Sequence, residues 1–136
     1  MAVNKDHVVT LSLTAASDMS AATNLYCFVT MPTSGNGDSC HLCTATSDMP
    51  IGVLQNLPAR GEAAEVVCVG VTKLRANADL TSIGGLLGTS TSARAAALTT
   101  ASSGAFPVAR LISIDNSDND GRLVTALLLP ALAPIS

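Results

Sequence analysis

Residues Pro50–Leu74, PIGVLQNLPARGEAAEVVCVGVTKL, consist of two apolar runs joined by a polar connection. The second run, Val66–Val71, is dense in β-branched residues, and this composition favours a strand over a helix. The connection contains Pro58, Gly61 and charged side chains, which suit a chain reversal at the edge of a sheet. The stretch therefore predicts a buried β-hairpin.

A looser version of this pattern occurs near the C-terminus. The apolar run Pro107–Ile114 is followed by DNSDNDG and then by a second apolar run, Leu123–Leu129. The repetition indicates that the hairpin unit is used twice.

Three more strands are expected before the central hairpin. Val8–Leu13 alternates apolar and polar residues, which predicts a half-buried strand with Val9, Leu11 and Leu13 on one face. Asn24–Met31 contains the only tyrosine and one of two phenylalanines, so this strand is expected to place aromatic side chains in the core. Cys40–Ala45 is expected to form a short strand.

Two segments stay open between alternatives. Thr14–Thr23 suits either a short helix beginning at Ser17 or Asp18 or a crossing loop. Ala93–Leu98 suits either a strand or one helical turn.

The chain as a whole is expected to be all-β, as a small β-barrel or β-sandwich domain with short loops and extended termini. Its 136 residues fit a single domain, residues 1–136. The predicted core consists of Leu11, Phe28, Val53, Val67, Val69, Ile112 and Leu127.

Charged residues are scarce in this sequence. Asp, Glu, Lys and Arg make up 12% of the chain, about half of the roughly 25% that is usual for a soluble domain. The low charge suggests that other protein covers part of the surface. A monomer with a Ser/Thr-rich surface is the alternative.

The charge pattern argues against nucleic acid as a partner, and the apolar pattern argues against a membrane. The net charge is −3, and the seven basic residues are scattered singly, so no basic patch faces a phosphate backbone. The N-terminal residues lack the continuous apolar core of a signal peptide, and the longest apolar run, ALLLPALAP, is too short to span a bilayer. We expect synthesis in the cytoplasm and export only as part of a particle.

The four cysteines are the first candidates for chemistry. Cys40 and Cys43 form a CxxC motif, while Cys27 and Cys68 each stand alone in apolar runs. Structural zinc sites pair two close couples of ligands, so this spacing disfavours zinc, and no βαβ pattern supports a redox CxxC. A Cys40–Cys43 disulfide formed after release is not indicated. We expect no metal and treat Cys27 and Cys68 as small buried hydrophobes.

The remaining reactive residues do not form a catalytic pattern. His7 and His41 are the only histidines, and no G-x-S-x-G motif accompanies them. The acidic cluster Asp115, Asp118 and Asp120 lacks the closing glutamate of a calcium loop and is interpreted as a turn. We expect neither an enzyme nor a cofactor.

The central stretch resembles a known family of viral proteins. The run GVLQNLPARGEAAEVVCVGVTKLRANADLT fits a pattern carried by Gly52, Val53, Pro58, Ala59, Gly61, Glu62, Val66, Gly70 and Val71. This pattern is similar to the core of the capsid cement (head decoration) proteins of tailed bacteriophages, from about Ile51 to Thr81. The resemblance implies a small β-rich structural protein that assembles as a homotrimer. It also implies attachment to the major capsid protein on the outside of an icosahedral shell, which it stabilises, and no catalysis.

The two ends of the chain are the expected contacts with the capsid or within the trimer. Residues 1–7 and 130–136 are candidate extended arms, because a terminus can add a strand to a neighbouring edge or fill an apolar groove. The expected contact residues are Ala2, Val3, Asn4, Lys5, Asp6, Leu132, Pro134 and Ile135. The alternative is that both ends are pinned to their own domain.

A second class of function remains open at this point. A small β-sandwich that recognises carbohydrate or a host surface also fits the expected fold. Sugar binding commonly uses exposed aromatic rings, and the chain contains only two Phe and one Tyr. This composition makes the binding module the less favoured alternative.

Overall fold

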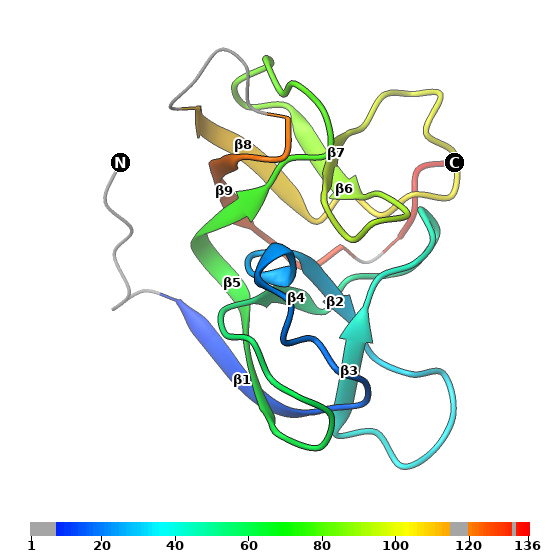
Figure 1. Ribbon diagram of the computed structural model, residues 1–136. Coiled ribbons are helices and arrows are strands. Elements are labelled where there is room, and N and C mark those ends of the chain that lie inside the picture. Colours follow the sequence, from blue (N-terminus) through cyan, green and yellow to red (C-terminus); the bar gives the residue numbers. More distant parts are fainter. Residues whose placement is uncertain (1–7, 115–119, 132) are drawn as a thin grey trace.

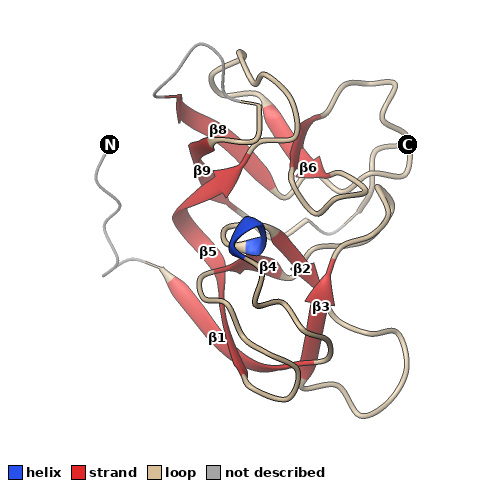
Figure 2. Ribbon diagram, in the orientation of Figure 1, coloured by secondary structure: helices blue, strands red, loops and turns tan. Residues whose placement is uncertain are grey.

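Residues 8–114, 120–131 and 133–136 are described in the computed structural model of the chain. They form an all-β fold with one short 3-10 turn, as Figure 2 shows. The strands are β1 (Val9–Ala15), β2 (Phe28–Thr30), β3 (Ser39–Leu42), β4 (Gly52–Leu54), β5 (Ala63–Arg75), β6 (Leu86–Thr89), β7 (Ala95–Ala97), β8 (Ala109–Ile114) and β9 (Leu123–Leu128), and the turn is η2 (Ala22–Asn24). The expected all-β fold class is confirmed.

The first five strands close into a small barrel. Their order is β1-β3-β2-β4-β5, and pairing of β1 with β5 completes the ring (Figure 1). All neighbours are antiparallel except β1 and β3, which run parallel through Thr14–Ser39 and Ala15–Cys40. The barrel alternative of the predicted fold is therefore the one observed.

The long strand β5 belongs to both halves of the molecule. Its first part pairs with β1 and β4, and its second part, Gly70–Arg75, pairs with β9. Gly70 has a φ of 117°, a conformation that side chains disfavour, at the point where the partners change. From there a second sheet continues in the order β5-β9-β8-β6-β7.

Both expected hairpins are present. In the central one, Val53 pairs with Val67 and Leu54 with Val66. Its reversal is held by Glu62, whose carboxylate Oε1 accepts a 2.7 Å hydrogen bond from the Ala59 N–H. The C-terminal hairpin is formed by β8 and β9. Because the turns lie between two long apolar runs in each case, local sequence is sufficient to predict them.

Two buried clusters hold the fold together. Strand residues alternate between the two faces, so Val66 points into the barrel while Val67 points to the second sheet. The barrel interior contains Ala15, Met19, Val29, Cys40, Leu54, Ala64 and Val66. The larger cluster lies between the barrel and the second sheet, and its members include Phe28, Val53, Val67, Leu74, Leu111, Val124 and Leu128.

The predicted core is correct only in part. Phe28, Val53 and Val67 are buried, whereas Val69, Ile112 and Leu127 are half-buried. Leu11 is 39% exposed and Val9 is 53% exposed, so the prediction that they lie in a half-buried face is wrong. The reason is topological, since β3 lies beside β1 only at its last two residues.

The open alternatives are also decided. Thr14–Thr23 is mainly a crossing loop that leads into η2, and no helix begins at Ser17 or Asp18. Ala93–Leu98 contains the strand β7. The expected strand Asn24–Met31 is shortened to β2, because Tyr26 takes a left-handed φ of 63°. Within the described residues, no helix is long and apolar enough to cross a membrane.

Candidate interaction surface

An apolar groove lies where the barrel meets the segment that leaves β9. Its volume is about 200 Å³. The lining residues are Met49, Pro50, Ile51, Gly52, Cys68, Val108, Leu128, Leu129, Pro130 and Ala131. None of them is charged, so the groove suits an apolar partner and offers no counter-charge to a phosphate.

Exposed apolar side chains gather around this groove. Among the described residues, Met49 is 54% exposed and Leu129 is 48% exposed, and both line it. Leu11 lies beside Cys68. Burial raises the pKa of the Cys68 thiol, and a hydrogen bond with the Leu11 backbone partly opposes that rise. Val9 pairs with Val69, the next residue along β5. The groove and the exposed part of β1 are therefore neighbouring apolar surfaces.

A larger hollow lies on the other side of Met49 and Ile51. Its volume is about 620 Å³, and it is lined by Thr30, Met31, Pro32, Thr33, His41, Ser47, Asp48, Met49, Ile51 and Phe106. The carboxylate of Asp48 accepts hydrogen bonds from the N–H groups of Thr44 (2.8 Å) and Ala45 (3.1 Å), so it closes a turn. His41 Nδ1 lies 2.9 Å from the Leu42 carbonyl oxygen. Both polar groups thus have local structural partners.

The CxxC motif is divided between the two cores. Cys40 lies in the barrel interior, whereas Cys43 belongs to the cluster under the second sheet. All four cysteines are free. Burial raises the pKa of the Cys43 thiol to about 12, although a hydrogen bond with Thr89 acts in the direction of a lower pKa. These thiols stay protonated at neutral pH and are poor nucleophiles or metal ligands.

The cysteine prediction needs one correction. Cys68 is half-buried and is the most accessible of the four, whereas the sequence predicts that it lies in a buried run. Its position at the edge of the barrel, beside the exposed part of β1, explains the difference.

Across the part of the chain that the structure describes, no three His, Cys, Asp or Glu side chains come together as a metal site.

Six of the eight expected contact residues fall outside the described part of the chain. Ala2, Val3, Asn4, Lys5, Asp6 and Leu132 lie outside the described residues, as do His7, Asp115 and Asp118. Pro134 is exposed. Ile135 is half-buried, and its backbone forms hydrogen bonds with Gly104 (2.7 Å) and Ala105 (2.8 Å). The tail is therefore attached to its own domain at Ile135.

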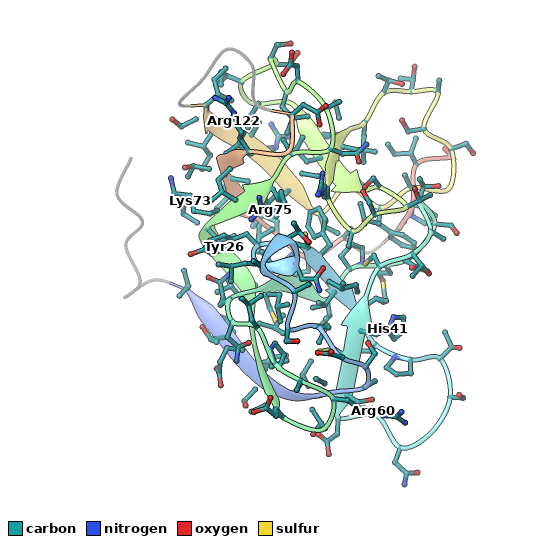
Figure 3. All side chains as sticks on the ribbon, in the orientation of Figure 1. Tyr26, His41, Arg60, Lys73, Arg75 and Arg122 are labelled. Atoms are coloured by element: carbon teal, nitrogen blue, oxygen red, sulfur yellow. The ribbon has the colours of Figure 1, made fainter. Side chains whose placement is uncertain are left out.

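Two basic side chains of β5 donate hydrogen bonds to neighbouring segments. Figure 3 shows Tyr26, Lys73 and Arg75 near the C-terminal end of β5. The Arg75 guanidinium donates to the carbonyls of Gly121 (3.0 Å) and Leu25 (3.4 Å), and Lys73 Nζ donates to Thr125 Oγ1 (3.2 Å). Arg75 thus links the Tyr26 turn to the segment that precedes β9.

The exposed surface around Val9, Leu11, Met49 and Leu129 is a site that the sequence does not predict. The alternation in Val8–Leu13 is visible in the sequence, but it does not reveal which residues lack a neighbouring strand. Met49 and Leu129 flank prolines at strand ends, and this is the only local signal that they border a loop.

Comparison with known proteins gives a fold and no sequence family. No family model matches the sequence, and no curated protein matches it. Among solved structures, the chain is similar to the N base of the head fiber gp8.5 of bacteriophage phi29. The identity is 17%, the TM-score is 0.63, and the alignment covers 93% of this chain and 98% of the other. At this identity the likeness establishes a shared fold, and the solved neighbour is a head fiber base rather than a cement protein.

Proposed function

We propose that this protein is a structural component of a bacteriophage virion. In this proposal it binds the outer surface of the icosahedral capsid as a homotrimer and stabilises the shell. The observation that carries the proposal is the fold shared with a phage head fiber base over nearly the whole of both chains. A shared fold is only an analogy for function. The physical argument for the proposal therefore comes from the surface of the protein.

The surface suits association with other protein. Only 12% of the residues are charged, and four large apolar side chains, Val9, Leu11, Met49 and Leu129, lie exposed in and around one apolar groove. Covering such side chains contributes about 25 cal/mol per Å² of apolar surface removed from water. The major capsid protein and further copies of this chain are the proposed partners.

The proposed mechanism is mechanical. A protein that binds neighbouring shell subunits adds its binding free energy to the work needed to separate them. Three copies joined as a trimer also keep one another close to their sites, which raises the effective concentration of each contact after one detaches. We assign the protein no enzymatic activity and place it on the virion, after synthesis in the host cytoplasm.

The ends of the chain remain the proposed contact residues. Ala2–Asp6 is proposed as a reaching arm. Leu132 is proposed as a further contact residue. For Pro134 and Ile135 the proposal takes a different form, because the Ile135 backbone forms hydrogen bonds within its own domain. Pro134 and Ile135 contribute as a fixed part of the surface, and Leu129–Ala131, which precede them in the chain, line the apolar groove.

The carbohydrate-binding alternative is disfavoured by the placement of the aromatic rings. Phe28 is fully buried, and Tyr26 and Phe106 are half-buried. Of these, Phe106 lines the larger hollow, beside His41 and Asp48. A stacking platform for a sugar needs at least one broadly exposed ring.

Addition of the purified protein to empty, expanded capsids of its own phage tests the proposal. We expect saturable co-sedimentation at sites of threefold symmetry and a higher temperature of shell disruption. A Met49→Lys, Leu129→Lys double variant should fold but bind more weakly, whereas Ile83→Lys, at another exposed apolar side chain, serves as the matched control. Binding to glycans without binding to shells would instead support the carbohydrate module.

A further inference from the structure

Strand β1 has an open edge along Val9–Leu13. On one side it pairs with β5 through this whole stretch, apart from a bulge between Val9 and Thr10. On the other side it meets β3 only at Thr14 and Ala15. Among the described residues, no strand pairs with Val9–Leu13 on that second side, and Figure 1 shows β1 at the margin of the barrel.

The direction of the backbone groups follows from the hydrogen bonds at the end of β1. The Ala15 N–H donates to the Glu62 carbonyl (2.8 Å), on the β5 side, and the Thr14 N–H donates to the Asp38 carbonyl (2.9 Å), on the β3 side. Successive residues of a strand direct their backbone groups to alternate edges. The N–H and C=O groups of Thr10 and Ser12 therefore point to the open edge.

Within the described stretch Val8–Ser17, this edge carries neither lysine nor proline, two residue types that commonly prevent strand addition. Residues Val8–Ser17 contain no charged residue and no proline. The two apolar side chains nearest the start of the strand, Val9 and Leu11, are 53% and 39% exposed. Edge strands are commonly protected by lysine, proline or a covering segment, and an uncharged apolar edge is a template for another strand.

We propose that this edge pairs in antiparallel fashion with the same edge of a second copy of this chain. The open stretch has Leu11 at its centre. A twofold axis there places Val9 opposite Leu13, Thr10 opposite Ser12, and Leu11 opposite its own counterpart. Each Thr10–Ser12 pair then exchanges two backbone hydrogen bonds, and the exposed parts of Val9 and Leu11 are covered.

A second copy is the occupant that the charge pattern favours. The stretch is symmetric about Leu11 in its alternation of apolar and hydroxyl side chains, and it brings no like charges together when it meets itself. This isologous contact is separate from the threefold contact of the proposed function and does not depend on it. A protein that uses both contacts assembles into even multiples of the trimer.

A site-specific cross-link tests the expected register. In a Cys68→Ala background, Leu11→Cys should give a covalent dimer on mild oxidation, because directly opposite residues have Cβ atoms about 4.5–5.5 Å apart. The three other native thiols are buried and should not interfere. Ile83→Cys in the same background places a thiol at a 60% exposed position and is the matched control. If Leu11→Cys cross-links no better than this control, the register is overturned.

A second measurement does not depend on how that variant folds. Sedimentation equilibrium of the unmodified protein should show species with an even number of chains. Ser12→Pro removes only an outward N–H, so it should keep the circular-dichroism spectrum and abolish the twofold contact. A monomer, or a trimer alone, would overturn the proposal. Loss of shell binding in Ser12→Pro without any even-numbered species would show that a shell strand occupies the edge instead.

Discussion

Gly52 lies where β4 and β5 approach each other too closely for a side chain. A methyl group at this position would meet Val66 Cγ1 at 2.6 Å and would come closer still to the carbonyl oxygen of Val67. Because that carbonyl belongs to the backbone of β5, no rotamer change can make room. Gly52→Ala must therefore separate the two strands of the central hairpin.

The expected cost can be estimated from three contributions. Overpacking of a tight site costs about 1–3 kcal/mol. Separation of the strands also weakens the neighbouring 2.8 Å hydrogen bond from the Gln55 N–H to the Glu65 carbonyl, which is worth about 1 kcal/mol. Alanine also lowers the conformational entropy of the unfolded chain, which offsets about 0.4–1 kcal/mol of the loss in stability. The net loss is about 1–4 kcal/mol, or a fall in Tm of roughly 4–14 °C for a domain of this size.

Thermal and urea denaturation followed by circular dichroism measure this loss. Gly61→Asn is the matched control, because Gly61 has a φ of 85° with nothing within 4 Å of the position that a Cβ would take, and asparagine tolerates this conformation. The control should change the free energy of unfolding by less than about 1 kcal/mol. If Gly52→Ala melts at the temperature of the parent, the close approach of β4 and β5 does not constrain the fold as argued.

Four further outcomes are expected. Phe28→Ala removes a fully buried ring between the barrel and the second sheet and should lower the free energy of unfolding by about 3–5 kcal/mol in urea; a loss below about 1 kcal/mol would contradict its central role. Between pH 9.0 and about 12 the unfolded state releases the Cys43 proton while the folded state retains it, so stability should fall as pH rises through this window, and Cys43→Ala should flatten that fall in pH-dependent melting. In thiol labelling of the native protein, Cys68 should react first and the three buried cysteines only after denaturant is added, so equal rates would be evidence against the observed burial. Deletion of Pro134–Ser136 removes the two backbone hydrogen bonds of Ile135 and should lower the free energy of unfolding by about 1–2 kcal/mol, whereas an unchanged Tm would show that the tail is not held there.

The hairpins are predictable because their determinants are local. In Pro50–Leu74 two apolar runs are separated by a connection with Pro58, Gly61 and Glu62, and the structure uses Glu62 and Gly61 in the reversal. The same holds for the pairing of β8 with β9. The proximity in sequence of the two strands fixes their partner, so no distant contact is needed for the prediction.

The candidate surface is not predictable, because it depends on strands that pair across long separations. Leu11 and Val66 pair although they lie far apart in the sequence, and the limited overlap of β1 with β3 decides that Leu11 stays exposed. The same topology leaves Cys68 accessible at the barrel edge and places Cys40 and Cys43 in different cores. Alternation along one strand gives the two faces but not what covers each of them.

By itself the sequence determined the all-β class, the two hairpins and the low charge of the surface, since each depends on composition or on residues close together in the chain. Only the tertiary structure decided that five strands close into a barrel, that β5 continues past Gly70 into a second sheet, and that Val9–Leu13 keeps an open edge. The physical reason is that the backbone partner and the burial of a residue depend on which strand, distant in the sequence, lies beside it in the fold. The apolar character of Leu11 is a property of the sequence, but its exposure is a property of β3 lying only beside Thr14 and Ala15.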